Sequence, residues 1–299
     1  MGNAAVNTSV RTIGFIGYGA MAIRMGANLR KAGYRIIAFV PSGKTDEDQT
    51  TLLPTPKAVA EQADLIIVCV PNDAALARSA DGKEGIFAGA RPGMLVLNTS
   101  TVSPEATDAL QKAGKEHDVR VLDAPMSGST PEAEKGELVM LVGGEAADVD
   151  AARPVLEAIS KAIVHAGPSG AGTKLKLVVN GIMGATLNIV SEGVIYGLCA
   201  GLDRDTLYDA LAQVAVISPH HKRKLLAAQK GAFPPQFPTR LMSKDMGLLI
   251  DTGRDVGAFM PGMAVAAQAL ALANRRHAND DYGSLIGAME HSIVPHQDS

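Results

Sequence analysis

The most constraining feature of the sequence is a group of small residues that follows its first apolar run. The run 12–17 (TIGFIG) is rich in strand-forming residues, and residues 20–33 after it have helical spacing. Gly17, Gly19 and Ala22 stand at this junction in a G-x-G-x-x-G/A pattern. The first glycine permits a tight turn, the second lets the backbone approach a pyrophosphate, and the alanine keeps the helix close to the strand. The pattern predicts a dinucleotide-binding βαβ unit; the alternative is a glycine-rich turn without a ligand.

Strand-like and helix-like segments alternate over the first half of the chain. Further strands are predicted at 34–40, 64–70, 93–100, 119–125, 137–144 and 162–167, with helices near 56–63, 72–79 and 103–116. Several of the strands are continuous apolar runs, which is typical of parallel strands covered on both faces. This alternation predicts an α/β fold, a doubly wound parallel sheet of the Rossmann type, over residues 1–172.

The pattern changes after residue 172, where strand-like runs almost disappear. Residues 173–199 are apolar nearly all round, which predicts a buried helix, and the rest of the chain continues as helices. We therefore expect an all-helical C-terminal domain over residues 173–299.

Composition narrows the class of function. The net charge of the 299 residues is -3, and the basic run 220–224 (HHKRK) is too short for a nucleic-acid surface, so no nucleic-acid partner is expected. No uninterrupted apolar stretch approaches the roughly 20 residues of a membrane span, and residues 1–11 lack a leader's apolar segment. Cys69 and Cys199 lie in apolar runs and are predicted to be buried thiols, and no metal-ligand spacing is found. These features predict a cytoplasmic protein that acts on a small molecule without a metal and without a membrane partner.

The turn after the second strand bears on the choice of cofactor. Enzymes that use NAD usually carry an acidic residue there, which binds the ribose 2′-hydroxyl. Here the segment 40–44 (VPSGK) offers no carboxylate before Asp46, and Ser42 and Lys44 suit a 2′-phosphate instead. The turn therefore favours NADP over NAD. The alternative is that Lys44 is a solvated loop lysine and that selectivity is loose.

Two later loops also follow predicted strands. Hydroxyl groups in 98–104 (NTSTVSP) are expected at the carboxyl ends of the strands, where open α/β sheets bind ligands. In 123–130 (DAPMSGST), small residues offer backbone N–H groups for a substrate carboxylate. Taken alone, each segment is equally well explained as an ordinary loop, the first of them with a helix cap.

Together these segments resemble the β-hydroxyacid dehydrogenase family, which includes 3-hydroxyisobutyrate dehydrogenases and glyoxylate/succinic semialdehyde reductases. The resemblance runs from about residue 12 to 290, on GFIGYGAMA, NTSTVSPE, DAPMSGSTPEAEKGELVMLVGG, GAGTKLKLVVN and FPTRLMSKDMGLL in the family's order. It implies a Rossmann domain, then an all-helical domain that begins with a long interdomain helix. The third and fifth segments look closer to the glyoxylate/succinic semialdehyde reductases. Two positions depart from the family: Ala22 replaces a usual glycine, and Val40-Pro41-Ser42 replaces the usual turn.

The resemblance also implies a catalytic lysine followed four residues later by an asparagine. Lys176 has this partner in Asn180, whereas Lys174 is followed by Val178. Hydride transfer to a carbonyl builds negative charge on its oxygen, which needs a proton donor. An ammonium group on an apolar helix is disfavoured, so we expect the pKa of Lys176 to fall toward the range of a general acid. Asn180 is expected to donate a hydrogen bond to a substrate hydroxyl or carboxylate. The alternative for Lys176 is a side chain that reaches along the helix into water.

The remaining predicted site residues follow from the loops and from the resemblance, which places Lys244 near cofactor and substrate and Phe237 over the nicotinamide. An exposed helix charge pair is the alternative for Lys244 and Asp245. The predicted substrate-binding residues are Thr101, Ser127, Gly128, Ser129, Asn180, Lys244 and Asp245. The predicted cofactor-binding residues are Gly17, Tyr18, Gly19, Ala20, Met21, Val40, Pro41, Ser42, Lys44, Val70, Pro71, Asn72, Thr101, Phe237 and Lys244.

The sequence thus predicts an NAD(P)-dependent oxidoreductase with Lys176 as general acid and base. It would move a hydride between the nicotinamide and a small hydroxy acid or its semialdehyde or keto acid. Helices 173–199 and 262–273 are too apolar for one domain to cover, which predicts a homodimer or a higher homo-oligomer. The alternatives are an imine reductase, which typically lacks the lysine, and a non-catalytic NAD(P)H-binding protein, which would not need Lys176 with Asn180.

Overall fold

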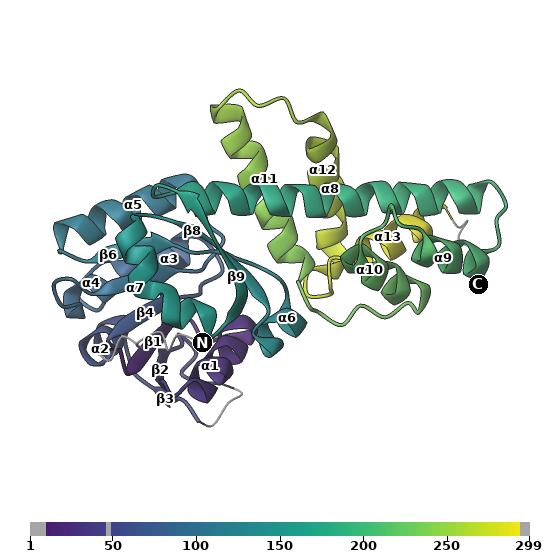
Figure 1. Cartoon of the computed structure of the whole chain (residues 1–299). Coiled ribbons are helices and arrows are strands. Elements are labelled where there is room, and N and C mark those ends of the chain that lie inside the picture. The colour runs from purple at the N-terminus through teal and green to yellow at the C-terminus, as the bar shows by residue number, and fades with distance from the viewer. Residues whose placement is uncertain (1–9, 46–48, 294–299) are drawn as a thin grey trace, which may run out of the picture. The chain divides into compact units, whose positions relative to one another are not determined.

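The computed structural model describes residues 10–45 and 49–293 (Figure 1). Residues 1–9, on which the expectation about a leader mostly rests, lie outside these ranges. The chain forms two compact units, Met1–Lys176 and Leu177–Ser299. The division between them falls within one long helix, α8 (Ala171–Cys199).

A largely parallel sheet forms the centre of the first unit. Its strand order is β3-β2-β1-β4-β5-β6-β8-β7, and β9 pairs with β8. The strands are β1 (Thr12–Ile16), β2 (Arg35–Phe39), β3 (Thr51–Leu52), β4 (Leu65–Val68), β5 (Leu95–Asn98), β6 (Arg120–Asp123), β7 (Met126–Ser127), β8 (Leu138–Gly143) and β9 (Ser160–Gly167). Strands β1 to β6 pair in parallel, whereas β8 is antiparallel to both β6 and β7. The predicted doubly wound sheet is confirmed, with β8 and its parallel neighbour β9 running opposite to β1–β6 near one edge.

Helices cover both faces of this sheet. Side chains of β1 alternate, so that Ile13 and Phe15 join one core and Ile16 joins the other. One face is covered by α1 (Ala20–Lys31), α6 (Thr130–Lys135) and α7 (Ala146–Glu157). The other is covered by α2 (Pro56–Gln62), α3 (Asp73–Ala80), α4 (Ile86–Gly89) and α5 (Pro104–Glu116). Two covered faces explain why the central strands are apolar without interruption.

Helices are the regular elements of the second unit within its described residues. It contains most of α8, followed by α9 (Arg204–Gln213), α10 (Pro219–Gln229), α11 (Thr239–Asp255), α12 (Pro261–His277) and α13 (Ser284–Ile293). Helices α11 and α12 lie side by side as a hairpin (Figure 1). Helix α11 also packs closely on α8, because a Cβ at Gly181 would lie 2.3 Å from Leu249 Cδ2. The predicted helical C-terminal region is confirmed.

Two expectations need correction, one about the cysteines and one about apolar stretches. Cys199 is exposed because it is the last residue of α8, and Cys69 is only partly buried, although burial raises the pKa of its thiol. Helix α8 is long and apolar enough, with a mean hydropathy of 1.4, to cross a membrane by length and composition alone. A core helix of a soluble protein passes the same test, so α8 carries no membrane assignment.

Candidate active site

The glycine-rich turn joins β1 to α1 and has the geometry of a nucleotide cradle. Gly17 has a φ of 86°, and a Cβ there would lie 2.3 Å from the Cys69 carbonyl oxygen, so only glycine fits. A Cβ at Gly19 would meet no atom within 4 Å, which leaves open space over the backbone. Gly19 precedes the first residue of α1 and brings no side-chain cap to it. The first N–H groups of α1 are therefore available to a phosphate.

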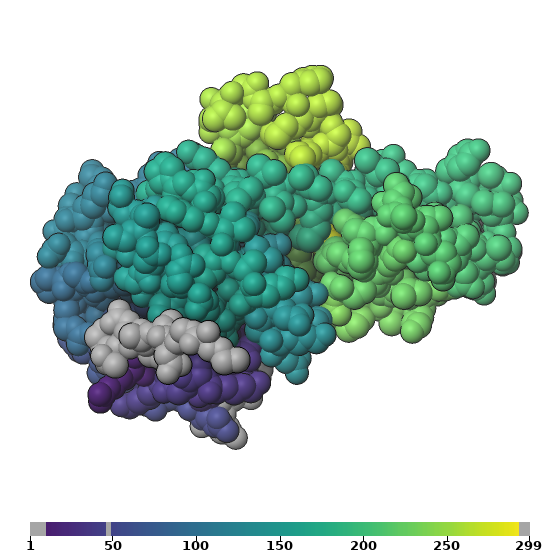
Figure 2. Space-filling model, in the orientation of Figure 1, coloured from purple at the N-terminus to yellow at the C-terminus, as the bar shows by residue number. Residues whose placement is uncertain are grey.

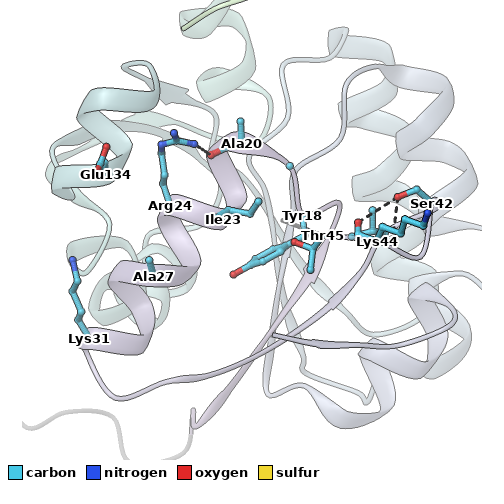
Figure 3. A pocket seen from close by; sticks show the side chains of 12 residues that line it. Tyr18, Ala20, Ile23, Arg24, Ala27, Lys31, Ser42, Lys44, Thr45 and Glu134 are labelled. Atoms are coloured by element: carbon cyan, nitrogen blue, oxygen red, sulfur yellow. Dashed lines mark hydrogen bonds between the residues drawn. The ribbon is translucent and has the colours of Figure 1, made fainter. Parts of the chain in front are cut away.

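A cavity of about 840 Å³ lies beside this turn (Figure 3). The turn residues Gly19 and Ala20 line it together with Ser42 and Lys44 from the loop after β2. Ser42 Oγ and the backbone of Lys44 are hydrogen-bonded to each other at 3.3 and 3.4 Å. Residues predicted separately from the glycine pattern and from the β2 loop thus line one cavity.

Arg24 lines the same cavity and was not singled out in the sequence. Its guanidinium donates to the Ala20 carbonyl oxygen at 2.8 Å, one turn back along α1 (Figure 3). Arg24 follows Ala20 by four residues and so lies one helical turn after the glycine-rich turn, and this spacing could have identified it from the sequence. Tyr18 also lines this cavity, but its side chain is only 3% exposed, and its hydroxyl accepts hydrogen bonds from Arg30 and Thr50.

The carboxyl edge of the sheet brings further predicted residues together. Val70 follows β4 and Thr101 follows the neighbouring β5, and the Val70 N–H donates to Ser100 Oγ at 2.9 Å. Asn72 caps α3 by accepting from the Ala75 N–H. These loops lie at the same edge as the turn after β1, because all three strands are parallel.

The loop after β7 is more constrained than the sequence indicated. Both the N–H and the hydroxyl of Ser129 donate to Glu132, at 2.8 and 2.7 Å, in a capping box at the start of α6. The Ser129 N–H, one of the donors predicted for a substrate carboxylate, is therefore occupied by a protein carboxylate. Gly128 has a φ of 127°, which only glycine adopts readily.

The two lysines of α8 have different surroundings. Lys176 is 8% exposed, whereas Lys174 is exposed. Lys176 follows the start of α8 by one turn, and that start is anchored at the carboxyl end of β6. Asp123, the last residue of β6, accepts hydrogen bonds there from the N–H groups of Gly170 and Thr173, both at 2.8 Å. Burial raises the pKa of the Asp123 carboxyl, and these two donors lower it in part.

In the second unit, Asn180, Lys244 and Asp245 form a connected polar group. Asn180 is 1% exposed, and its Nδ2 donates to Asp245 Oδ2 at 2.6 Å. The Lys244 ammonium lies 2.8 Å from Asp245 Oδ1. The carboxylate fixes the orientation of the Asn180 amide, because only Nδ2 can donate to it. Asn180 Oδ1 is buried and accepts no hydrogen bond from any described residue. Asn180 can thus accept a hydrogen bond from a ligand as well as donate one, whereas the sequence predicted donation alone.

Phe237 is held by a buried ion pair that the sequence did not reveal. Its N–H donates to Asp281 Oδ2 at 3.0 Å, and its ring meets the Tyr282 ring edge-on, 5.9 Å between centroids. Asp281 pairs with Lys224 at 2.8 Å, and both side chains are at most 4% exposed. Burial lowers the pKa of the neighbouring His220 to about 4, so its ring, hydrogen-bonded to the Tyr282 hydroxyl, is neutral at pH 7.

Two family models match the chain. Residues 12–167 match the NAD binding domain of 6-phosphogluconate dehydrogenase, and residues 170–289 match the model described as NAD-binding of NADP-dependent 3-hydroxyisobutyrate dehydrogenase. "Probable 3-hydroxyisobutyrate dehydrogenase, mitochondrial" of Dictyostelium discoideum is 32% identical over 84% of this chain and 81% of its own length. The chain belongs to the β-hydroxyacid dehydrogenase family.

Other relatives cover nearly the whole of this β-hydroxyacid dehydrogenase. Glyoxylate/succinic semialdehyde reductase 1 of Arabidopsis thaliana is 30% identical over 94% of this chain and 99% of its own. A solved structure of Mycobacterium tuberculosis 3-hydroxyisobutyrate dehydrogenase with L-serine has a TM-score of 0.83 and is 27% identical, covering 94% and 99% of the two chains. The protein is accordingly an NAD(P)-dependent oxidoreductase that moves a hydride between nicotinamide and a hydroxy acid or its oxidised form.

Proposed function

We propose that this enzyme reduces a small aldehyde or keto acid to a hydroxy acid, and catalyses the reverse reaction, with Lys176 as the general acid and base. One observation carries the assignment: of the two lysines at the start of α8, Lys176 is buried and Lys174 is exposed. Burying a lysine is costly unless its charge is paired or its pKa falls, and a buried ionisable group next to the predicted ligand-binding loops supports a functional role.

The chemistry requires a donor at the carbonyl oxygen. A reduced nicotinamide, when bound, would supply the hydride. The Lys176 ammonium would give its proton to the carbonyl oxygen as negative charge develops there. In the oxidation direction, the neutral lysine amine takes the proton from the hydroxyl.

Asn180 and Lys244 are proposed to orient the substrate. Asn180 Oδ1 is a buried acceptor, which suits a substrate hydroxyl, and the second Nδ2 proton suits a carbonyl or carboxylate oxygen. Lys244 is partly exposed beside Asp245 and offers a positive charge for the substrate carboxylate. Asp245 is then the residue that holds both groups in place.

We propose a substrate of the glyoxylate or succinic semialdehyde type, or the corresponding hydroxy acid. The near full-length relative from Arabidopsis bears that name, and the segments around residues 127–138 and 237–246 have the same resemblance. L-Serine in the Mycobacterium structure is likewise a small acid with a hydroxyl group. The test is a panel of small aldehydes, keto acids and hydroxy acids, assayed with NADPH and NADH by absorbance of the reduced nicotinamide. Turnover confined to substrates without a carboxylate would contradict the proposal.

We propose a preference for NADP. The support is the cavity in which Ser42, Lys44 and Arg24 lie around the start of α1, without an acidic residue from the β2 turn segment 40–44. Acidic residues at that turn normally bind the ribose hydroxyl and repel a 2′-phosphate. Glu134 lines the cavity from α6 and reduces its positive charge, which argues for a modest preference rather than exclusion of NAD.

We further propose a cytoplasmic homodimer, or a higher homo-oligomer, built on the helical unit. Exposed apolar side chains form one line along α8, since 178, 182, 189 and 196 lie within about 40° of each other around a helix. Val178, Ile182, Ile189 and Tyr196 are 48%, 55%, 67% and 77% exposed. Val265 and Leu272, seven residues apart on α12, are 55% and 68% exposed. A partner subunit is the simplest cover for such a surface, and two free thiols are typical of a reducing compartment.

A further inference from the structure

Asp123 is a buried acidic residue for which the proposed chemistry has no direct use. It ends β6 and is 0% exposed. Its Oδ1 accepts from the Gly170 N–H and its Oδ2 from the Thr173 N–H, both at 2.8 Å. Both donors belong to the turn that opens α8, so the carboxylate caps this helix from the neighbouring sheet.

The surroundings leave room for this cap. Gly143 pairs with Asp123 across β6 and β8, and a Cβ at Gly143 would lie 2.6 Å from Asp123 Oδ1. A Cβ at Gly172 would lie 2.3 Å from the Leu141 carbonyl oxygen, so glycine is needed for α8 to begin directly against β8. The Thr173 hydroxyl also meets the Thr107 hydroxyl of α5 at 3.0 Å, and both residues are buried. The start of α8 is thereby tied to two strands and a helix of the first unit.

These contacts at the start of α8 fix the position of Lys176. It follows Thr173 by three residues, about 4.5 Å along the helix axis and on the same side of the helix. Asp123, Gly170, Thr173 and Lys176 all belong to the first compact unit, which also carries the glycine-rich turn. We propose that Asp123 is a positioning residue that holds the Lys176 ammonium at the place where the proton is transferred. This inference rests on the proposed function of Lys176 as general acid.

The test replaces Asp123 with an isosteric amide. In Asp123→Asn, the amide oxygen still accepts one backbone N–H, but the amide nitrogen cannot accept the other, so the first turn of α8 loses one tether. Because a misplacement of about 1 Å can cost about 100-fold in rate, we expect kcat to fall about 10- to 100-fold. The Kd of NADPH, measured by fluorescence, should stay within about twofold, because the glycine-rich turn is untouched.

Thr55→Ala is the matched control. Thr55 Oγ1 accepts from the Ala58 N–H at 3.1 Å and caps α2 in the same unit, away from α8. Loss of the Thr55 cap should lower the Tm without lowering kcat. This control separates the effect of losing a helix cap from the effect of displacing the Lys176 ammonium. A fall in kcat for Thr55→Ala as large as for Asp123→Asn would contradict the proposal.

A double-mutant cycle distinguishes this inference from the proposed function. On a Lys176→Ala background, Asp123→Asn should reduce the residual kcat no further, because the group that it positions is absent. If Asp123→Asn lowers kcat on the Lys176→Ala background by the same factor as in the otherwise wild-type protein, the positioning role is contradicted but the proposed function of Lys176 is not. Wild-type turnover in Lys176→Ala by itself would overturn the proposed function.

Thr107→Val, which removes only the hydroxyl contact to Thr173, is the second variant should Asp123→Asn not fold. As a single variant, Thr107→Val should lower kcat several-fold, and on the Lys176→Ala background it should leave kcat unchanged. An unchanged kcat in the single variant would contradict the inference.

Discussion

Lys174 and Lys176 show how two identical residues receive different roles from helix geometry. Residues two apart on an α-helix point about 200° away from each other, so they face nearly opposite sides. Lys174 is exposed and Lys176 is buried, and Asn180 follows Lys176 one turn later. The proposed catalytic role thus depends on a register that a shift of one residue in α8 would destroy.

At this scale, Asp245 provides a test of substrate orientation. Asp245→Asn weakens the hold on Asn180 and removes the negative charge beside Lys244. Hydrogen bonds to charged groups contribute about 1.5–3 kcal/mol, so we expect kcat/KM to fall roughly 10- to 100-fold. Asp251→Asn on the same helix is the control, because Asp251 is 73% exposed and pairs only with Arg254 among the contacts of the described residues. Equal kcat/KM for the two variants would show that Asp245 has no part in binding.

Pro41 provides a test of the cofactor assignment. Pro41→Asp adds a carboxylate to the β2 turn, where it can bind a ribose diol and repel a 2′-phosphate. Exposed charge contacts contribute at most about 1 kcal/mol, so the wild type should prefer NADPH within roughly tenfold and the variant should shift toward NADH. The measurement is kcat/KM for both cofactors in both proteins. A wild type that strongly prefers NADH would place ribose recognition outside residues 40–44.

At the scale of elements, the buried pair of Lys224 and Asp281 joins α10 to the segment before α13 and to the turn that carries Phe237. Lys224→Met leaves a buried carboxylate without its cation, which costs about 3–5 kcal/mol in comparable proteins. We expect a clear fall in the free energy of unfolding, measured by denaturant titration. Arg254→Met breaks a pair whose side chains are 74% and 73% exposed, and it should change stability by no more than about 0.5 kcal/mol. Similar losses in the two variants would contradict the burial argument.

The elements also show what could be predicted from sequence. Strands β1, β4 and β5 were predictable because two covered faces make them uninterrupted apolar runs, and α8 because it is apolar all round. Helices α6 and α7 were missed, since α6 is short and α7 contains Pro154, and so were the two-residue strands β3 and β7. The local pattern of apolar and polar residues does not show which residues distant in sequence form hydrogen bonds or ion pairs with each other. The bond from Asp123 to α8 and the pair of Lys224 with Asp281 therefore became visible only in three dimensions.

At the scale of the whole molecule, the apolar line on α8 predicts self-association. A monomer has a mass of 31.0 kDa, so light scattering should give at least twice this mass. Ile189→Glu places a charge in the middle of the line and should release monomers. Val216→Glu is the control, because Val216 is 86% exposed but lies outside that line. The segment between α11 and α12, which carries the 93% exposed Phe259, lies at the surface in Figure 2 and offers a second control position. A monodisperse monomer of the wild type would contradict the dimer.

The central claim, that Lys176 is the proton donor, is tested most directly by the turnover of Lys176→Ala with a substrate identified from the panel. Removing a general acid costs about 100- to 10,000-fold, so kcat should fall by that factor. The Kd of NADPH should be nearly unchanged, because Lys176 is proposed to act on the substrate oxygen. Lys174→Ala, two residues away and exposed, should keep nearly all of the wild-type kcat. Wild-type turnover in Lys176→Ala, or equal losses in both variants, would contradict the account.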